Sequence, residues 1–281
     1  MTNRRDFLKT SGLLTTALSI GIFPKCTSKN IKEPGLILGT VKDQLKKDYK
    51  GTLKIIADTG YKYIEGIAAD IPLEQFGKDL YALGLIPVAS GSSIYQLQTS
   101  LDSYISDAKK LNQEYLVCYW PWLDGADNLT LDEFKACAKR LNDVGEKCAD
   151  AGLKFAFHNH DKEFKNFDGT IGMDVILENT KPEWVTVELD LYWIIKAGYK
   201  PTKYFEKYPG RYELFHVKDM DHTQERERTC VGDGIIDFVE IFQKADQAGV
   251  KYYIVEQEAA KPETQIECIK TSYQHLTNLD Y

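Results

Sequence analysis

Short runs of apolar residues alternate along the chain with longer stretches in which apolar residues recur every three or four positions. The short runs have the length of buried strands, and the longer stretches are typical of amphipathic helices. We expect helices around 53–57, 73–83 and 94–111, among others. We expect strands at eight places: 36–39, 63–65, 86–89, 115–119, 154–158, 185–190, 212–216 and 252–256.

Capping and turn residues mark where these helices begin and end. Thr130 precedes a helical stretch and Glu133 follows three residues later, which is a capping box. A glycine that can end a helix stands before several of the strands, at Gly60, Gly84, Gly152 and Gly249. Eight alternating strands and helices without a linker predict a single-domain α/β fold, the (β/α)8 TIM barrel.

An open, doubly wound sheet is the other fold that such alternation can build. A dinucleotide-binding sheet of that kind carries G-x-G-x-x-G after its first strand, whereas this position reads Leu38-Gly39-Thr40-Val41-Lys42. Polar residues also gather where the strands end, and a TIM barrel builds its active site there. Both observations favour the barrel.

The first 26 residues predict an export signal. Arg4-Arg5 resembles the start of a twin-arginine signal, and the apolar run 11–23 is too short to span a bilayer. A cytosolic protein with a chance Arg-Arg pair is the alternative. We expect the barrel to occupy 27–281 and to work in the periplasm or outside the cell. A lipid on Cys26 is the one membrane attachment that the sequence leaves open.

Net charge and cysteine spacing argue against a nucleic-acid-binding protein and against a zinc site made of cysteines. A formal charge of −7 argues against a partner rich in phosphate, so we expect no nucleic-acid partner. No C-x-x-C pair is present, which gives no support to a thiolate zinc site. We expect buried free thiols, although an oxidising compartment would permit one bridge. The six cysteines are Cys26, Cys118, Cys137, Cys148, Cys230 and Cys268.

Histidines and carboxylates stand at the ends of the expected strands. His158 and His160 lie two residues apart, as do Glu188 and Asp190, so each pair points to one side of an extended chain. Mixed nitrogen and oxygen ligands suit transition metals better than calcium or magnesium. We expect one divalent ion, Mn²⁺ first, with Zn²⁺, Co²⁺ or Fe²⁺ as alternatives. Similar residues at other strand ends are Glu65, His216, Lys218, Glu256 and Glu258.

These strand ends resemble the xylose isomerase-like barrels, or sugar phosphate isomerases/epimerases, which include inosose dehydratases, ketose 3-epimerases and endonuclease IV. The resemblance implies Asp190, His216 and Glu256 as metal ligands. The family's fourth ligand is a fifth-strand glutamate, where this chain has His158, so His158, His160 and Glu163 stay open as the fourth. The motifs that carry the resemblance to this family are 60–65 (GYKYIE), 157–164 (FHNHDKEF), 188–193 (ELDLYW), 216–219 (HVKD) and 232–238 (GDGIIDF).

The resemblance implies a metal-dependent isomerase or epimerase that moves a proton next to the carbonyl of a sugar, keto-sugar or polyol. Glu256 or His158 would take the proton. Lys218 would stabilise negative charge or protonate a leaving oxygen, unless it only pairs with Asp219 or Glu188. A histidine on the fifth strand weakens the case for epimerisation by two opposed glutamates.

The sequence also leaves rival functions open and predicts which residues contact the substrate. The main rival is a metal-dependent lyase or dehydratase acting on 3-keto-glycosides or inosose-like compounds. A carbohydrate-binding barrel without activity is a further one, and five histidines with a charge of −7 disfavour an endonuclease. The oligomeric state stays open. We expect the substrate to contact Glu65, His160, Trp120, Trp193 and Glu258.

Overall fold

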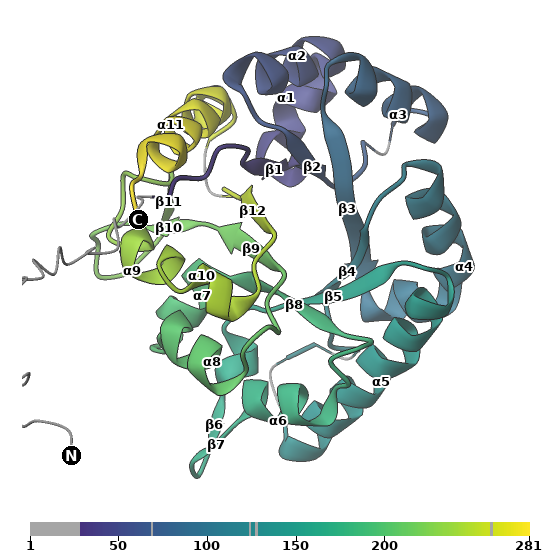
Figure 1. Cartoon of the computed structure of the whole chain (residues 1–281), viewed down its shortest axis with the longest axis vertical. Helices are drawn as coiled ribbons and strands as arrows, with labels where there is room; N and C mark the ends of the chain where they lie inside the picture. The colour runs from purple at the N-terminus through teal and green to yellow at the C-terminus, as the bar shows by residue number, and fades with distance from the viewer. Residues whose placement is uncertain (1–28, 69, 124, 127–128, 259–260) are drawn as a thin grey trace, which may run out of the picture.

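Eight parallel strands hydrogen-bond side by side and close into a barrel (Figure 1). The computed structural model describes residues 29–281, apart from 69, 124, 127–128 and 259–260. The predicted (β/α)8 barrel is confirmed; β2 and β5 have the expected bounds, and the ends of the other strands differ from expectation by up to four residues. In barrel order the strands are β1 (Gly35–Ile37), β2 (Tyr63–Glu65), β3 (Ile86–Ser93), β4 (Tyr115–Trp120), β5 (Lys154–His158), β8 (Thr186–Asp190), β9 (Leu214–Val217) and β12 (Tyr252–Val255).

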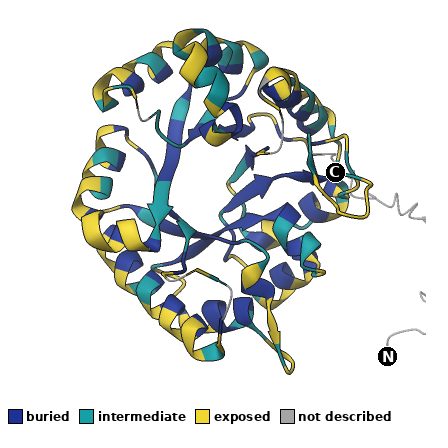
Figure 2. Ribbon diagram, turned by 180° about the vertical axis from the view of Figure 1, so that it is seen from behind, coloured by how far each residue is buried: buried dark blue, intermediate teal, exposed yellow. Residues whose placement is uncertain are grey.

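Helices surround the barrel and bury their apolar faces against the outside of the strands (Figure 2). The capping box predicted at Thr130 is present. The predicted terminating glycines have positive φ angles, 110° at Gly60 and 89° at Gly249. The helices are α1 (Lys42–Lys47), α2 (Tyr49–Thr59), α3 (Leu73–Ala82), α4 (Ile94–Lys110), α5 (Leu131–Asp150), α6 (Gly172–Asn179), α7 (Leu191–Lys196), α8 (Pro201–Lys207), α9 (Phe238–Phe242), α10 (Ala245–Ala248) and α11 (Gln265–Asn278).

Short elements occupy the connections between strands and helices. The predicted export signal and Cys26 lie outside the described residues. Within the described part of the chain, no helix combines the length and the apolar character needed to cross a membrane. The short elements are the 3-10 helices η1 (Leu38–Val41), η2 (Lys162–Phe164) and η3 (Pro262–Thr264), and the hairpins β6 (Asn166–Phe167) with β7 (Thr170–Ile171) and β10 (Asp219–Met220) with β11 (Arg228–Thr229).

The two-residue period of a strand decides which side chains face the barrel axis. Ala156, Leu214 and Ile254 belong to a small apolar cluster inside the barrel. Residues two positions further along each strand face the same way. The strands β5, β9 and β12 therefore direct His158, His216 and Glu256 into the mouth of the barrel.

A polar network closes the opposite end of the barrel. The ammonium group of Lys154 lies 2.8 Å from carboxylate oxygens of both Glu114 and Glu213. Tyr252 donates a hydrogen bond of 2.8 Å to Glu114, and Tyr115 donates to Glu213. These residues are partly exposed, so water screens the ion pairs. The network ties four strands together at the floor and leaves the mouth as the open end.

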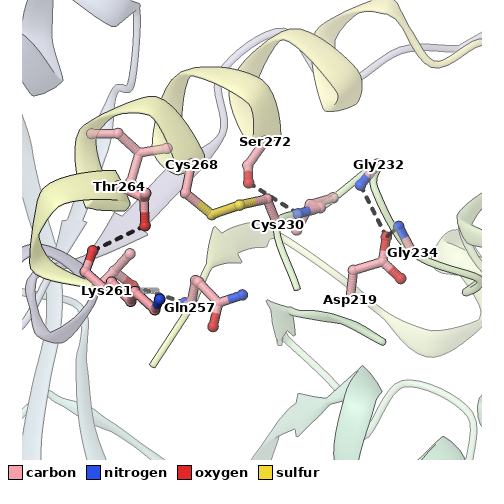
Figure 3. The surroundings of a disulfide bond; sticks show 12 residues. Asp219, Cys230, Gly232, Gly234, Gln257, Lys261, Thr264, Cys268 and Ser272 are labelled. Carbon is pink, nitrogen blue, oxygen red and sulfur yellow. Dashed lines mark hydrogen bonds between the residues drawn. A yellow bond between two sulfur atoms is a disulfide. The ribbon is translucent and has the colours of Figure 1, made fainter. Parts of the chain in front are cut away.

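A disulfide joins Cys230, in the segment that follows β11, to Cys268 on α11 (Figure 3). The two Cα atoms are 5.3 Å apart. One turn further along α11, the Ser272 hydroxyl accepts a hydrogen bond of 3.1 Å from the backbone N–H of Val231. The bond and the disulfide together hold the long connection between β9 and α9 against the last helix.

The cysteine expectation was therefore right for three residues and wrong for two. Cys118, Cys137 and Cys148 are buried free thiols. Burial raises the pKa of each of these thiols, so they are poor nucleophiles. Cys230 and Cys268 instead form the single bridge that the sequence left open. Their 38-residue separation gave no sign of the contact, which depends on how α11 packs.

Loss of the disulfide will destabilise the barrel. Closing a loop of 38 residues lowers the entropy of the unfolded chain, and the expected contribution is about 2–4 kcal/mol. We expect the double variant Cys230→Ser/Cys268→Ser to lose that much free energy of unfolding in denaturant titrations. The stability of the double variant should not respond to reductant, whereas the control Cys148→Ser, at a buried free thiol, keeps the disulfide and should respond as the wild type does. Equal stability of the wild type with and without reductant would contradict this role.

Candidate metal centre

Four side chains from neighbouring strands meet at the mouth of the barrel: His158, Asp190, His216 and Glu256. One ligand atom from each lies within 4.8 Å of the others, and all four residues are buried. They stand on β5, β8, β9 and just past β12, which are consecutive around the barrel. The strand register pairs Asp190 with His216, so these two arrive at one level. The fold thus brings together the four ligands expected from the sequence.

His216 lies at the centre of this cluster. Its Nδ1 atom is 2.9 Å from Glu256, and its Nε2 atom is 3.1 Å from Glu65 and 3.3 Å from Glu188. Burial alone would lower the pKa of this imidazole, but the carboxylates of Glu188, Glu65 and Glu256 raise it well above its ordinary value. When no metal ion is bound, His216 therefore supplies positive charge among Glu65, Glu188 and Glu256.

Lys218 is the second cation of the cluster, and its partners differ from those expected. Its Nζ atom lies 3.0 Å from Asp190, 2.8 Å from Glu256 and 3.1 Å from Glu258. Burial opposes the charge, but the acids hold the pKa of this 1%-exposed ammonium group above its ordinary value. The expected alternative, a simple ion pair with Asp219 or Glu188, is wrong.

Asp219 points away from the cluster and organises the loop that follows. Its carboxylate accepts hydrogen bonds from the backbone N–H groups of Met220, Gly232, Gly234 and Ile236 (Figure 3). The side chain of Asp219, the first residue of β10, is thus used for structure. Sequence spacing alone could not distinguish it from its neighbour Lys218.

Several buried polar atoms of the cluster have no hydrogen-bond partner. These are both carboxylate oxygens of Glu188, Nδ1 of His158 and Oδ2 of Asp190. The His158 and Asp190 atoms lie near charged groups, at 3.2 Å from Glu188 and 3.0 Å from Lys218, but not in hydrogen-bond geometry. Buried atoms of this kind are costly unless something binds them. A divalent cation fits this donor set.

The protonation states of two of the four residues, His158 and Glu256, also suit a bound cation. Burial, and after it the neighbouring His216, lower the pKa of His158 well below its ordinary value, so its imidazole is neutral. Burial would raise the pKa of Glu256, but Lys218 and His216 lower it well below the usual range, which keeps the carboxylate ionised. Neutral imidazole and ionised carboxylate are the forms that bind metal ions.

The two other candidates for the fourth ligand lie apart from the four. Glu163 is fully buried, where its carboxylate accepts hydrogen bonds of 2.8 Å from the Trp122 indole and 2.6 Å from the backbone N–H of His160. Burial raises the pKa of Glu163 to about 7. His160 is partly exposed at the mouth, and burial lowers its pKa to about 4. This geometry favours His158 over both.

Four of the expected substrate contacts lie at the rim of the barrel mouth, and the fifth, Glu65, lies beneath them. The ring of His160 lies 5.4 Å from that of Trp120 and 5.6 Å from that of Trp193. Glu258 is exposed beside them, whereas Glu65 lies inside the barrel with no exposed surface. Trp120, Trp193, His160 and Glu258 can therefore meet a substrate directly. Glu65 sits beneath them, in contact with His216.

Three further residues complete the site. Arg228, from the loop that the disulfide fastens, lies 2.8 Å from Glu258. Tyr119 donates a hydrogen bond of 2.6 Å to Glu65. Asn159 accepts one of 3.0 Å from the backbone N–H of Asp190. The motif around His158 could have drawn attention to Asn159, but no local signal marks Arg228.

Comparisons with known proteins agree with this barrel fold. The chain is 24% identical to an inosose dehydratase of Lacticaseibacillus casei over 218 residues, which cover 71% of this chain and 66% of that relative. The chain spans between about half and two thirds of the length of the curated relatives that it matches. It is 28% identical to a sugar phosphate isomerase/epimerase from Parabacteroides distasonis, whose crystal structure superimposes with a TM-score of 0.73 over 88% of this chain and 93% of that chain.

A structure described as the IolI protein with a bound zinc atom shares the fold, with a TM-score of 0.70 and 16% identity over 87% of this chain and 98% of that chain. Residues 53–278 match the family described as Xylose isomerase-like TIM barrel. That range includes seven of the eight barrel strands and all four residues of the cluster. The chain therefore belongs to the xylose isomerase-like TIM barrel family.

Proposed function

We propose that the chain is a metal-dependent lyase or dehydratase that removes water or an alcohol from a keto-sugar or inosose-like substrate. The observation that carries the proposal is the buried Lys218 ammonium group beside the four-residue cluster. The relatives named inosose dehydratase support elimination over the isomerase or epimerase expected first. Both reactions begin with loss of the proton next to a carbonyl.

His158, Asp190, His216 and Glu256 would hold the divalent ion. Such an ion supplies Lewis-acid polarisation of the substrate carbonyl, which acidifies the neighbouring C–H bond. The zinc atom of the IolI structure makes zinc one candidate, beside the manganese expected from the ligand types. We assign Glu256 to holding the ion, because its contacts with His216 and Lys218 make it a weak base.

His160 is then the residue placed to take the proton. It lies at the mouth, within 4.9 Å of His158 between ring centroids, and its Nδ1 atom has no hydrogen-bond partner. As the C–H bond breaks, its electron pair forms a C=C bond and the bond to the leaving oxygen breaks. Lys218 donates a proton to that oxygen, so water or an alcohol departs and no oxidant is needed.

An exported enzyme would meet free sugars and glycosides, since sugar phosphates are made inside cells. We propose that the chain works outside the cytoplasm. The disulfide supports this, because such bonds persist mainly in oxidising compartments. The arginine pair and apolar run at residues 4–23 support it independently.

Metal analysis of purified variants tests the ligand set. We expect about one equivalent of divalent metal in the wild type, and its loss in His158→Ala, Asp190→Ala and His216→Ala. Even residues that only orient ligands change metal affinity roughly 10- to 100-fold, so direct ligands should change it more. Glu163→Gln should keep the metal, as should the control His222→Ala at an exposed position. Retention by His158→Ala with loss by Glu163→Gln would reverse our choice of fourth ligand.

Separate assays of proton removal and leaving-group release test the roles of His160 and Lys218. With a 3-keto-glycoside in D₂O, we expect His160→Gln to slow both proton removal and leaving-group release by roughly 10²- to 10⁴-fold. Lys218→Met should slow release by a similar factor while exchange of the α-hydrogen for deuterium continues. Lys203→Met, on the exposed side of α8, is the matched control. Exchange in the wild type without any release would instead favour the isomerase or epimerase.

A further inference from the structure

A cavity of about 500 Å³ opens beside the metal centre, on the other half of the barrel mouth. It lies over the ends of β1, β2, β3 and β4, whereas the four ligands come from β5, β8, β9 and β12. Because the strands of each set are consecutive, the mouth consists of a polar half and a second half with its own cavity. The lining is mainly aliphatic and aromatic: Ile37, Leu38, Leu45, Ile67, Ile71 and Tyr119.

Two contacts join this cavity to the metal centre. Tyr119 lines the cavity and donates a hydrogen bond of 2.6 Å to Glu65, which in turn contacts His216 at 3.1 Å. Gly66 also lines it and directly follows Glu65 in the chain. A ligand that fills the cavity is therefore separated from His216 by two side chains, Tyr119 and Glu65.

The side chains that line the cavity indicate the chemical character of the group that would fill it. Several of the aliphatic side chains, such as Ile67 and Ile71, are only half buried, so an apolar group would remove their remaining surface from water. A second sugar ring would place hydroxyl groups against these aliphatic side chains, which cannot bond them. The charged residues that line the cavity, Lys42, Lys46 and Asp70, are exposed to water. A cavity of this volume holds an organic group of drug-like size.

We propose that this cavity binds the apolar aglycone of a glycoside whose oxidised sugar ring lies over the metal centre. The inference rests on the proposed function and narrows its substrates from keto-sugars in general to glycosides with an aromatic or aliphatic aglycone. The sugar ring meets the imidazoles and carboxylates, and the aglycone extends across Tyr119 toward η1 and α1.

Calorimetric titration with two unoxidised glycosides tests the proposal without turnover, because neither has an acidic C–H bond beside a carbonyl. We expect metal-loaded wild type to bind phenyl β-D-glucopyranoside roughly 10- to 100-fold more tightly than methyl β-D-glucopyranoside, from burial of the phenyl ring. Cellobiose, which carries a second sugar instead, should resemble the methyl glucoside.

Gly39 offers a variant that fills the cavity and a matched control. It lines the cavity, its φ angle is not positive, and a Cβ atom there would meet nothing within 4 Å. Gly39→Phe should therefore reduce the phenyl preference to less than about threefold, while Gly39→Ala keeps it. Leu45→Gln should also lower the preference, and it serves if Gly39→Phe does not fold.

Three results would overturn the proposal. The first is that the wild type does not bind the phenyl glucoside, or binds it no more tightly than the methyl glucoside. The second is that cellobiose binds as tightly as the phenyl glucoside. The third is that the preference for the phenyl glucoside persists in both Gly39→Phe and Leu45→Gln. Concentration-dependent association of the wild type in sedimentation, abolished by Gly39→Phe, would assign the cavity to a second copy of the chain. A failure of keto-sugar turnover alone would remove the proposed reaction and leave the measured preference intact.

Discussion

Buried negative charge at the mouth of the barrel is the constraint on which the rest of the site depends. Glu65, Glu188 and Asp190 have no exposed surface, and removing a carboxylate from water costs several kcal/mol. The neighbouring His216 and Lys218 offset part of this cost. Apolar residues at these strand ends would be as stable or more so. The acids are therefore explained by what they bind, and both oxygens of Glu188 still lack a hydrogen-bond partner.

The part of the site that the sequence predicted follows from the period of a strand. His158 and His216 stand two residues beyond positions that face the barrel interior, and the C-terminal ends of parallel strands meet at one edge. Contacts made by long connections could not be predicted this way. Arg228 reaches Glu258 from a loop whose path is fixed by α11. The choice of Asp190 over Asp219 as the partner of Lys218 likewise depends on the β9 end, where Asp219 bonds the loop backbone.

The division of the mouth into two halves links the fold to selectivity. At β1 to β4 the cavity is lined by residues such as Ile37, Gly66 and Gly91, and a bulky polar residue of this lining, Tyr119, donates a hydrogen bond to Glu65. At Gly91 a Cβ atom would lie 1.8 Å from the Val117 carbonyl oxygen, so this wall is built from close backbone approach. The four candidate metal ligands and the apolar lining of the cavity are thus carried by separate sets of strands, and Glu65 on β2 and Tyr119 on β4 connect them.

A histidine on the fifth strand also changes the charge balance of the reaction. With His158 in that place, the four ligands contribute two carboxylates and two imidazoles. Asp190 and Glu256 then balance the charge of a divalent ion, whereas a glutamate at position 158 would add a third carboxylate and repel an oxygen that becomes negative as the α-proton departs. The Lys218 ammonium group, which contacts both of these acids, is the cation positioned to meet it. A site that relies on a lysine in this way has a proton donor close to the reacting carbon, which suits elimination better than proton exchange between two opposed carboxylates.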